Sequence, residues 1–204
     1  MSLKIIILAG GKGIRISPVI GNTPKILASV AGKPFLEWFL MWIRNWKLEV
    51  DFEILISTCV GHNQIKDYCL KNNYDIKCIK EEKPLGTFGA IANVASQDYS
   101  KNYLVLNGDT IFKADFKRIF NSFINQGKKS PLLILKESFT NERYGGYENT
   151  NLGWIFTNKR TSYISMGAFF ISYKSIKERW LNKTSLNFDT VEINQQTLGE
   201  LMID

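Results

Sequence analysis

Short apolar runs alternate along this chain with segments in which apolar residues recur at helical spacing. The first run, Leu3–Leu8, is continuous and rich in β-branched residues, which is typical of a strand buried on both faces of a sheet. Further strands are predicted at 52–56, 76–79, 103–106 and 132–135, with helices at 35–46, 63–70, 89–95 and 114–124. This β-α-β-α-β-α-β-α-β order predicts an α/β protein with three α/β/α layers around a mainly parallel, mixed sheet.

The pattern changes after Ser138. Asn, Gly and Tyr dominate residues 141–153, two strand-like runs follow at 154–157 and 163–173, and a short helix is predicted at 175–181. No repeat or low-complexity segment separates these parts. We therefore expect a single domain over residues 1–204, with a core over 1–137 and a shortened extension over 138–204 on the substrate side.

Composition narrows the class of protein. Of the 204 residues, 45% are hydrophobic and 22% are charged, which excludes a disordered chain and a coiled-coil rod. No apolar run approaches the ~20 residues that a membrane-spanning helix needs. The apolar stretch at the amino terminus is too short for a signal peptide and leads directly into glycines. We expect a cytoplasmic protein with no membrane partner.

The chain is basic, with 26 Lys plus Arg against 19 Asp plus Glu and a net charge of +7. The basic residues stand singly or in pairs, unlike the long runs of nucleic-acid-binding arms. Aromatic residues lie in apolar periodic runs, where a core role is favoured over base stacking. We expect no nucleic-acid partner. A solvated basic surface and the attraction of a polyanionic substrate both remain open.

The cysteines and the one histidine do not indicate a metal site. Cys59, Cys69 and Cys78 form no C-x-x-C pair, and with His62 they lack the spacing of a zinc site. We expect free thiols in a reducing compartment. His62 follows Gly61 and precedes a helical pattern, so it is interpreted as a helix-start residue and not as a catalytic base.

The strongest local motif, Leu-Ala-Gly-Gly-Lys-Gly-Ile-Arg, runs from Leu8 to Arg15 directly after the first predicted strand. Loops at the carboxyl ends of strands are where open α/β sheets bind ligands, and glycines let backbone N–H groups approach a phosphate. Ile16 breaks the dinucleotide pattern G-x-G-x-x-G. From this motif alone, a tight structural turn and a phosphate site are both open.

Charged residues are predicted at the same edge of the sheet. Arg15 and Lys25 supply cations, which a triphosphate needs. Asp109 follows a predicted buried strand, and a carboxylate there suits Mg²⁺, which binds through one or two carboxylates plus substrate phosphates. The structural alternative for Asp109 is a turn aspartate.

Five motifs in a fixed order carry a resemblance to a known family. They are Leu8-Ala9-Gly10-Gly11-x-Gly13-x-Arg15, Pro24-Lys25, Val30-Ala31-Gly32-Lys33-Pro34, Pro84-Leu85-Gly86-Thr87-x-Gly89-Ala90 and Asn107-Gly108-Asp109. With these motifs the chain resembles the sugar-1-phosphate nucleotidylyltransferases, and more weakly so beyond the last motif. The most similar subgroup is the guanylyltransferases acting on D-glycero-D-manno-heptose 1-phosphate, followed by the mannose-1-phosphate guanylyltransferases.

The resemblance implies a Rossmann-like nucleotidyltransferase fold and an Mg²⁺-dependent enzyme. Its substrates would be a nucleoside triphosphate, here GTP, and a sugar 1-phosphate, and its products an NDP-sugar and pyrophosphate. By motif position Arg15, Lys25 and Asp109 would be catalytic, with the two cations on phosphate oxygens and Asp109 on the metal. The nucleotide would be bound by Leu8, Ala9, Gly10, Gly11, Gly13, Glu81, Pro84, Gly86 and Thr87.

Glu81 falls where the family reads the edge of the base. Its carboxylate can accept hydrogen bonds from both N1–H and N2–H₂ of guanine, a pair of donors that adenine and thymine do not offer. The alternative is a solvated surface charge.

On the sugar side, the resemblance implies contacts from Gly145, after Arg143-Tyr144, and from Lys159, which would hold the sugar phosphate. Asn158 stands where a sugar-binding glutamate is usual, and Ser165-Met166-Gly167 replaces Asn-Ala-Gly. The family's late Ile-Asp-Ile-Gly segment, with a second metal ligand, has no clear counterpart. We therefore expect GTP binding with weak turnover, unless Asp204, Asp189 or Glu192 supplies that carboxylate.

Two further functions stay open at this stage. One is a cytidylyl or uridylyl transferase that acts on another phosphorylated small molecule. The other is a nucleotide-binding or regulatory homologue without the second metal ligand. A homodimer also remains open.

Overall fold

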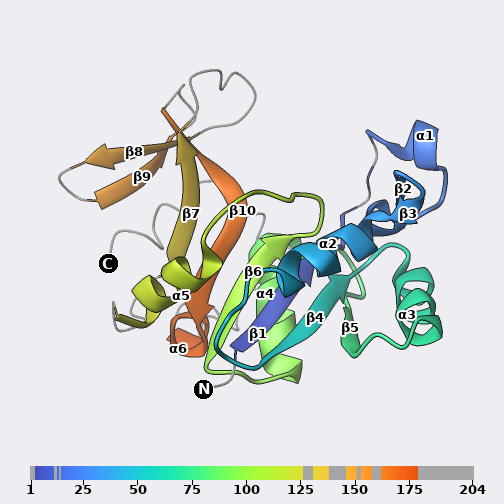
Figure 1. Cartoon of the computed structure of the whole chain (residues 1–204), viewed down its shortest axis with the longest axis horizontal. Helices are drawn as coiled ribbons and strands as arrows, with labels where there is room; N and C mark the ends of the chain where they lie inside the picture. Colours follow the sequence, from blue (N-terminus) through green and yellow to red (C-terminus); the bar gives the residue numbers. More distant parts are fainter. Residues whose placement is uncertain are drawn as a thin grey trace.

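A computed structural model of the chain describes residues 3–11, 13, 15–125, 131–137, 146–150, 153–157 and 162–178 (Figure 1). The helical elements are α1 (Ser17–Ile20), the short 3₁₀ helix η1 (Lys25–Leu27), α2 (Phe35–Arg44), α3 (His62–Lys71), α4 (Gly86–Gln97), α5 (Phe116–Asn125) and α6 (Tyr173–Ile176). The strands are β1 (Leu3–Leu8), β2 (Ser29–Val30), β3 (Lys33–Pro34), β4 (Phe52–Thr58), β5 (Ile76–Lys80), β6 (Asn102–Asn107), β7 (Leu132–Glu137), β8 (Gly146–Thr150), β9 (Gly153–Thr157) and β10 (Tyr163–Ser172).

One mixed sheet organises the fold. Its strands lie in the order β5-β4-β1-β6-β10-β8-β9, and β7 also pairs with β10. The first four strands are parallel, whereas β10 runs antiparallel to β6. The chain therefore leaves β1 toward β4 and β5 on one side and later returns to β6 on the other. In open α/β sheets such a reversal of strand order places a crevice at the carboxyl ends of the central strands.

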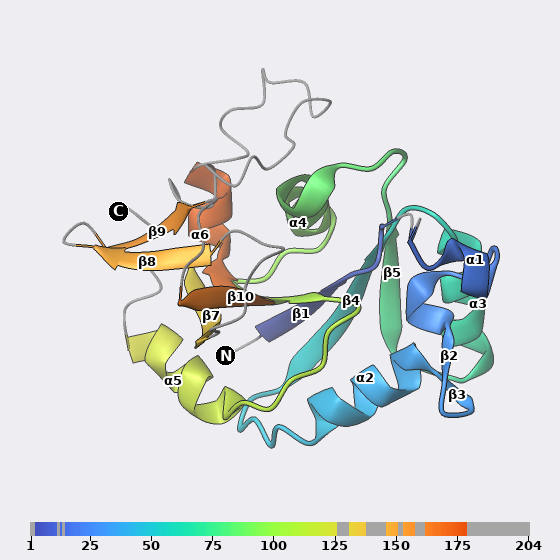
Figure 2. The ribbon, with the colours of Figure 1, turned by 90° about the horizontal axis from the view of Figure 1, so that it is seen from above.

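Alternating side chains of the central strand point into two hydrophobic cores. Ile5 and Ile7 pack with residues of α2, α3 and α5, whereas Ile6 packs with residues of α4 and α6. Figure 2 shows α2 and α5 on one side of the sheet and α4 and α6 on the other. The predicted α/β/α layers and mixed sheet are confirmed, and the continuous apolar run of β1 is explained by burial on both faces.

Most element boundaries agree with the sequence prediction to within a few residues, and the differences have local causes. Helix α4 begins at Gly86, inside the expected turn, and the N–H of Leu85 just before it donates to the Glu81 carboxylate. The run predicted to extend to residue 173 ends at Ser172, whose hydroxyl accepts the N–H of Ser175 and begins α6. Predicted helix residues 179–181 lie outside the described residues.

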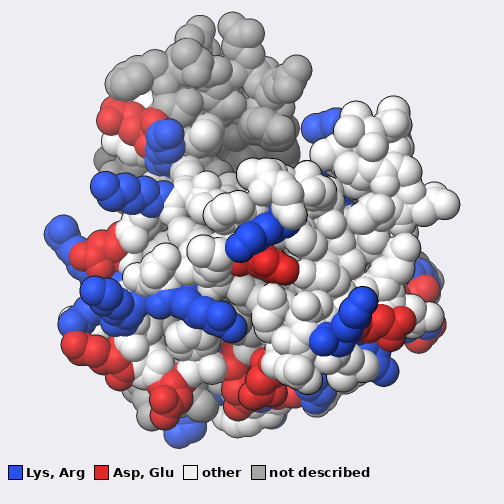
Figure 3. All heavy atoms as spheres, turned by 45° about the vertical axis from the view of Figure 1, so that its right-hand side comes forward, with Lys and Arg blue, Asp and Glu red and all other residues white. Residues whose placement is uncertain are grey.

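Several elements have no counterpart in the prediction. They are α1, η1, the β2–β3 hairpin and β8. Among the described residues, no helix is both long and apolar enough to cross a bilayer. On the face shown in Figure 3, basic and acidic side chains of the described residues are interspersed, without a continuous basic band.

Candidate active site

The glycine-rich loop and the end of β6 meet at the crevice beside the central strand. The N–H of Gly108 donates to the carbonyl of Leu8 over 3.0 Å, and the N–H of Ala9 donates to the carbonyl of Ser57 over 2.8 Å. A Cβ at Gly108 would lie only 2.7 Å from that Leu8 carbonyl oxygen, so this approach requires glycine. The carboxyl ends of β4, β1 and β6 are thereby joined into one edge that bears the sequence motifs.

A pocket of about 240 Å³ opens at this edge. It is lined from the end of β1, the turn after β5 and the first turns of α4, with one residue from β6. Seven of its lining residues are predicted nucleotide-binding residues: Leu8, Gly10, Gly11, Glu81, Pro84, Gly86 and Thr87. The other two lining residues, Ala90 and Asn107, are not among the predicted site residues. Ala90 and Asn107 belong to the sequence motifs, but a small apolar side chain and a terminal strand amide gave no signal of a role.

Glu81 is buried in the wall of this pocket, with 5% of the residue exposed. Its Oε1 accepts a hydrogen bond from the Ser57 hydroxyl at 2.9 Å, and its Oε2 accepts the N–H of Leu85 at 3.0 Å. Among the described residues no lysine or arginine forms an ion pair with it. The alternative of a solvated surface charge is therefore wrong for Glu81.

Lys25 and Asp109 form an ion pair beside the pocket. Nζ of Lys25, at the start of η1, lies 2.5 Å from Oδ2 of Asp109, and the Thr110 hydroxyl donates to Oδ1 at 3.0 Å. Partial burial opposes ionisation of Asp109, but the hydrogen bonds from Lys25 and Thr110 outweigh it, so the pKa of this carboxyl lies below its ordinary value. Asp109 therefore contacts a motif lysine from a distant segment, and its role as a metal ligand stays a prediction.

The remaining predicted phosphate ligands are on the loop between β1 and α1. Gly13 lies against Lys25: a Cβ built at Gly13 would be 3.9 Å from Cβ of Lys25. Arg15 is exposed at the start of the turn that leads into α1. The structure thus places Gly13, Lys25 and Asp109 together, with Arg15 two residues further along the chain.

The donor set fits Mg²⁺ bound through one protein carboxylate together with substrate phosphates. Among the described residues, no group of three His, Cys, Asp or Glu side chains could hold a metal. Asp109 is half-exposed, and within the described part of the chain its cationic partner is Lys25, so the carboxylate is accessible to a hydrated cation. No disulfide joins Cys59, Cys69 and Cys78 to one another.

The predicted sugar-side residues lie outside the described part of the chain. They are Arg143, Tyr144, Gly145, Asn158 and Lys159, together with the candidate carboxylates Asp189, Glu192 and Asp204. Gly167 is described, on β10, and a Cβ there would lie 2.5 Å from Nδ2 of Asn107. The Ser165-Met166-Gly167 motif therefore lies against a residue that lines the pocket.

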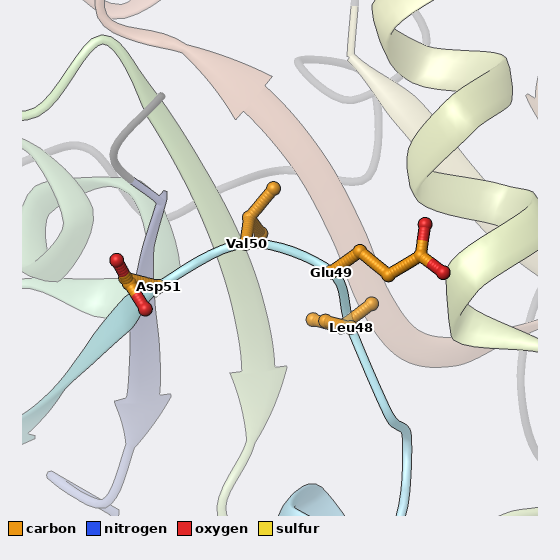
Figure 4. Close-up of a pocket in the computed structure, with 4 residues that line it drawn as sticks. All are labelled: Leu48, Glu49, Val50 and Asp51. Carbon is orange, nitrogen blue, oxygen red and sulfur yellow. The ribbon is translucent and has the colours of Figure 1, made fainter.

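A second hollow, of about 280 Å³, lies elsewhere on the molecule (Figure 4). It is lined by residues 48–51, immediately before β4, and so lies at the amino ends of the parallel strands. Glu49 is paired there with Lys117 at 2.5 Å. None of the sequence motifs reaches it, and the candidate site is the pocket at the opposite edge.

Comparison with known proteins agrees with this geometry. The nucleotidyl transferase family matches residues 4–179. The chain is 35% identical over 149 residues to D-glycero-alpha-D-manno-heptose 1-phosphate guanylyltransferase of Aneurinibacillus thermoaerophilus, covering 70% of this chain and 61% of that protein. It is 32% identical over 120 residues to mannose-1-phosphate guanylyltransferase of Mycobacterium tuberculosis, covering 57% and 32%.

A solved structure is also similar. HddC from Yersinia pseudotuberculosis complexed with GMP-PN matches with a TM-score of 0.71 and 28% identity, over 86% of this chain and 79% of that one. The chain spans about three fifths of the length of its heptose 1-phosphate guanylyltransferase relative. The resemblance carried by the motifs is confirmed: the chain belongs to the nucleotidyl transferase family, among the sugar-1-phosphate nucleotidylyltransferases.

Proposed function

We propose that this chain transfers a guanylyl group from GTP to a heptose or mannose 1-phosphate, giving a GDP-sugar and pyrophosphate. The observation that carries the choice of base is the Glu81 carboxylate, buried in the pocket wall with two hydrogen-bond donors and no cationic partner among the described residues. The two relatives named above act on these two sugar phosphates, which supports the choice of acceptor.

A carboxylate has about four acceptor positions, two on each oxygen. Ser57 and Leu85 occupy one position on each oxygen of Glu81, which leaves one on each for a ligand. Guanine offers N1–H and N2–H₂ side by side and can fill both. Uracil offers one N–H between two carbonyls, and adenine and cytosine offer one amino group beside an acceptor nitrogen. A buried carboxylate therefore favours guanine.

The phosphates would extend from this pocket along the glycine-rich loop toward Lys25 and Arg15. An oxygen of the sugar phosphate attacks the α-phosphorus of GTP, a new P–O bond forms, and the bond to pyrophosphate breaks. The loop N–H groups at Gly11 and Gly13 hold the triphosphate, and Lys25 and Arg15 stabilise the charge that builds on its oxygens. Asp109 would hold Mg²⁺, which when bound neutralises phosphate charge.

Nucleotide ranking tests the proposal. Thermal shift is measured with GTP, ITP, ATP, CTP and UTP, each with and without Mg²⁺. A ligand at 100 times its Kd stabilises the folded state by about 2.7 kcal/mol, which raises the melting temperature of a chain this size by roughly 5–10 °C. We expect GTP to give the largest shift. A larger shift with CTP or UTP would assign the chain to the pyrimidine alternative, and no shift with any of them would exclude nucleotide binding.

Turnover is tested separately, by pyrophosphate release from GTP with heptose 1-phosphate and with mannose 1-phosphate. A Glu81→Gln variant is the matched probe for the base. An amide offers one acceptor oxygen and brings a donor toward the other guanine N–H, so GTP should bind about tenfold or more weakly while the CTP and UTP affinities stay the same. An unchanged ranking would remove Glu81 from base recognition.

A further inference from the structure

Ser57 lies behind the pocket wall and is not among the residues that line it. It is the penultimate residue of β4, is fully buried, and pairs in register with Leu8 of β1 and Ile79 of β5. Its carbonyl also accepts the N–H of Ala9 at 2.8 Å. Its backbone is thus held on both sides in the middle of the parallel sheet, directly beneath the glycine-rich loop.

The Ser57 side chain connects this fixed backbone to Glu81 by a hydrogen bond. Its hydroxyl donates to Oε1 over 2.9 Å, and the N–H of Leu85 donates to Oε2 over 3.0 Å. Gly10 closes a third side, because a Cβ at that position would lie 2.8 Å from Oε1. The orientation of the Glu81 carboxylate is therefore fixed by one hydrogen-bond donor on each oxygen and by the close approach of the Gly10 backbone.

We propose that Ser57 is a positioning residue that sets the nucleotide preference through Glu81 without touching the nucleotide. The inference rests on the proposed function, in which both oxygens of Glu81 accept from guanine. Recognition by two parallel hydrogen bonds requires both oxygens in a fixed plane, because an error in the tilt of the carboxylate lengthens at least one of them. Removing the Ser57 hydroxyl leaves Oε1 free to rotate away.

A purely structural role for Ser57 makes a different prediction. If the hydroxyl serves only to satisfy a buried carboxylate, its removal lowers stability and weakens all nucleotides alike. If it orients Glu81, its removal weakens GTP more than ITP, because ITP lacks the 2-amino group and makes only one of the two hydrogen bonds. The ratio of the ITP and GTP dissociation constants therefore separates the two roles.

The experiment compares the whole chain with Ser57→Ala, Ser57→Cys and Thr58→Val. Thr58 is the matched control: it is the next residue, equally buried, and its hydroxyl contacts the carbonyl of Ile79 and Nδ1 of His62 instead of Glu81. Ser57→Cys keeps the volume of the side chain but offers only a weak donor, so it separates packing from hydrogen bonding. Dissociation constants for GTP and ITP are measured by competition, and melting temperatures are recorded alongside.

In the unmodified chain we expect ITP to bind about tenfold more weakly than GTP, the usual effect of one buried hydrogen bond. Ser57→Ala and Ser57→Cys should each bring the two constants to within about twofold, mainly by weakening GTP, and Thr58→Val should keep the original ratio. Two results would overturn the role of Ser57 while leaving the preference for GTP intact. The ratio of the ITP and GTP dissociation constants could stay unchanged in both Ser57 variants, or it could fall as much in Thr58→Val as in them. A chain that does not prefer GTP at the outset would instead overturn the proposed function. If Ser57→Ala does not fold, Ser57→Cys alone decides the question.

Discussion

Nζ of Lys25 lies 2.5 Å from Oδ2 of Asp109, so the cation expected to bind phosphate and the anion expected to bind metal neutralise each other in the free protein. Their side chains are 45% and 40% exposed, and an ion pair this open to solvent contributes only about 0–1 kcal/mol to stability. Both groups can therefore exchange partners when a nucleotide and a cation arrive. In the proposed reaction, the pair would hold both side chains in place until then.

The first prediction concerns Lys25. Lys25→Ala should reduce turnover by about 10²–10³, because a preorganised charge at a phosphoryl centre typically lowers the barrier by ~3–4 kcal/mol. The melting temperature should change little. Lys117→Ala is the control, since Lys117 forms an ion pair of the same length with Glu49 and is 47% exposed. Pyrophosphate release and thermal melting are measured for both, and an equal loss of turnover in Lys117→Ala would show that the effect is not specific to the site.

The second prediction concerns Asp109. Asp109→Asn should remove the stimulation of GTP binding by Mg²⁺, and Asp75→Asn, an exposed aspartate away from the pocket, should retain it. Because the pKa of Asp109 is lowered, its ion pair contributes fully above the unfolded value of 3.8 and is lost only as the pH falls through the lower, folded value. The difference in melting temperature between the unmodified chain and Asp109→Asn should thus be constant from about pH 5 to 8. A difference that titrates within this range would show that the pKa of Asp109 is not lowered.

The third prediction separates two neighbouring glycines. A Cβ at Gly10 would meet Oε1 of Glu81 at 2.8 Å, whereas a Cβ at Gly11 would meet nothing within 4 Å. Gly10→Ala should therefore displace Glu81 and reduce the preference for GTP over ITP. Gly11→Ala should fold normally and weaken all nucleoside triphosphates to a similar extent, because it only hinders approach of the phosphates. Competition binding with GTP, ITP and UTP checks both, and interchanged effects would refute this division of the loop.

The sequence alone is sufficient to predict the central strands and the edge of the sheet where the motifs meet. Few residue types are found in a strand that is buried on both faces. The run Ile5, Ile6 and Ile7 therefore predicts such a strand clearly. By contrast, β8 has the sequence Gly-Tyr-Glu-Asn-Thr, which has little strand propensity and is a strand because it pairs with β9. Such an element depends on its partner and has no local signal.

The partners of the site residues are equally hidden from the sequence. Lys25 and Asp109 are 84 positions apart, and their contact follows from the strand order that brings η1 and the end of β6 together. Ser57 is one hydroxyl near the end of a largely apolar strand, and in the sequence nothing distinguishes it from a purely structural residue. Its contact with Glu81 depends on the register of β4 with β5, which residue spacing does not determine.

The last prediction concerns pH and the only histidine. Burial, followed by the nearby charges of Lys66 and Lys80, lowers the pKa of His62 below 6.5, so the fold favours the neutral ring, whose Nδ1 lies 2.7 Å from Oγ1 of Thr58. A group whose pKa is depressed on folding stabilises the protein above its unfolded pKa, and this contribution is lost as the pH falls toward the folded value. The melting temperature should accordingly be flat between about pH 7 and 8 and should decline as the pH falls below about 6.5. His62→Gln, which keeps a polar side chain beside Thr58, should remove the part of this decline that lies above about pH 5, where carboxylates begin to titrate. Melting curves of both proteins at half-unit pH steps test this, and parallel profiles across the whole range would show that His62 does not couple protonation to folding.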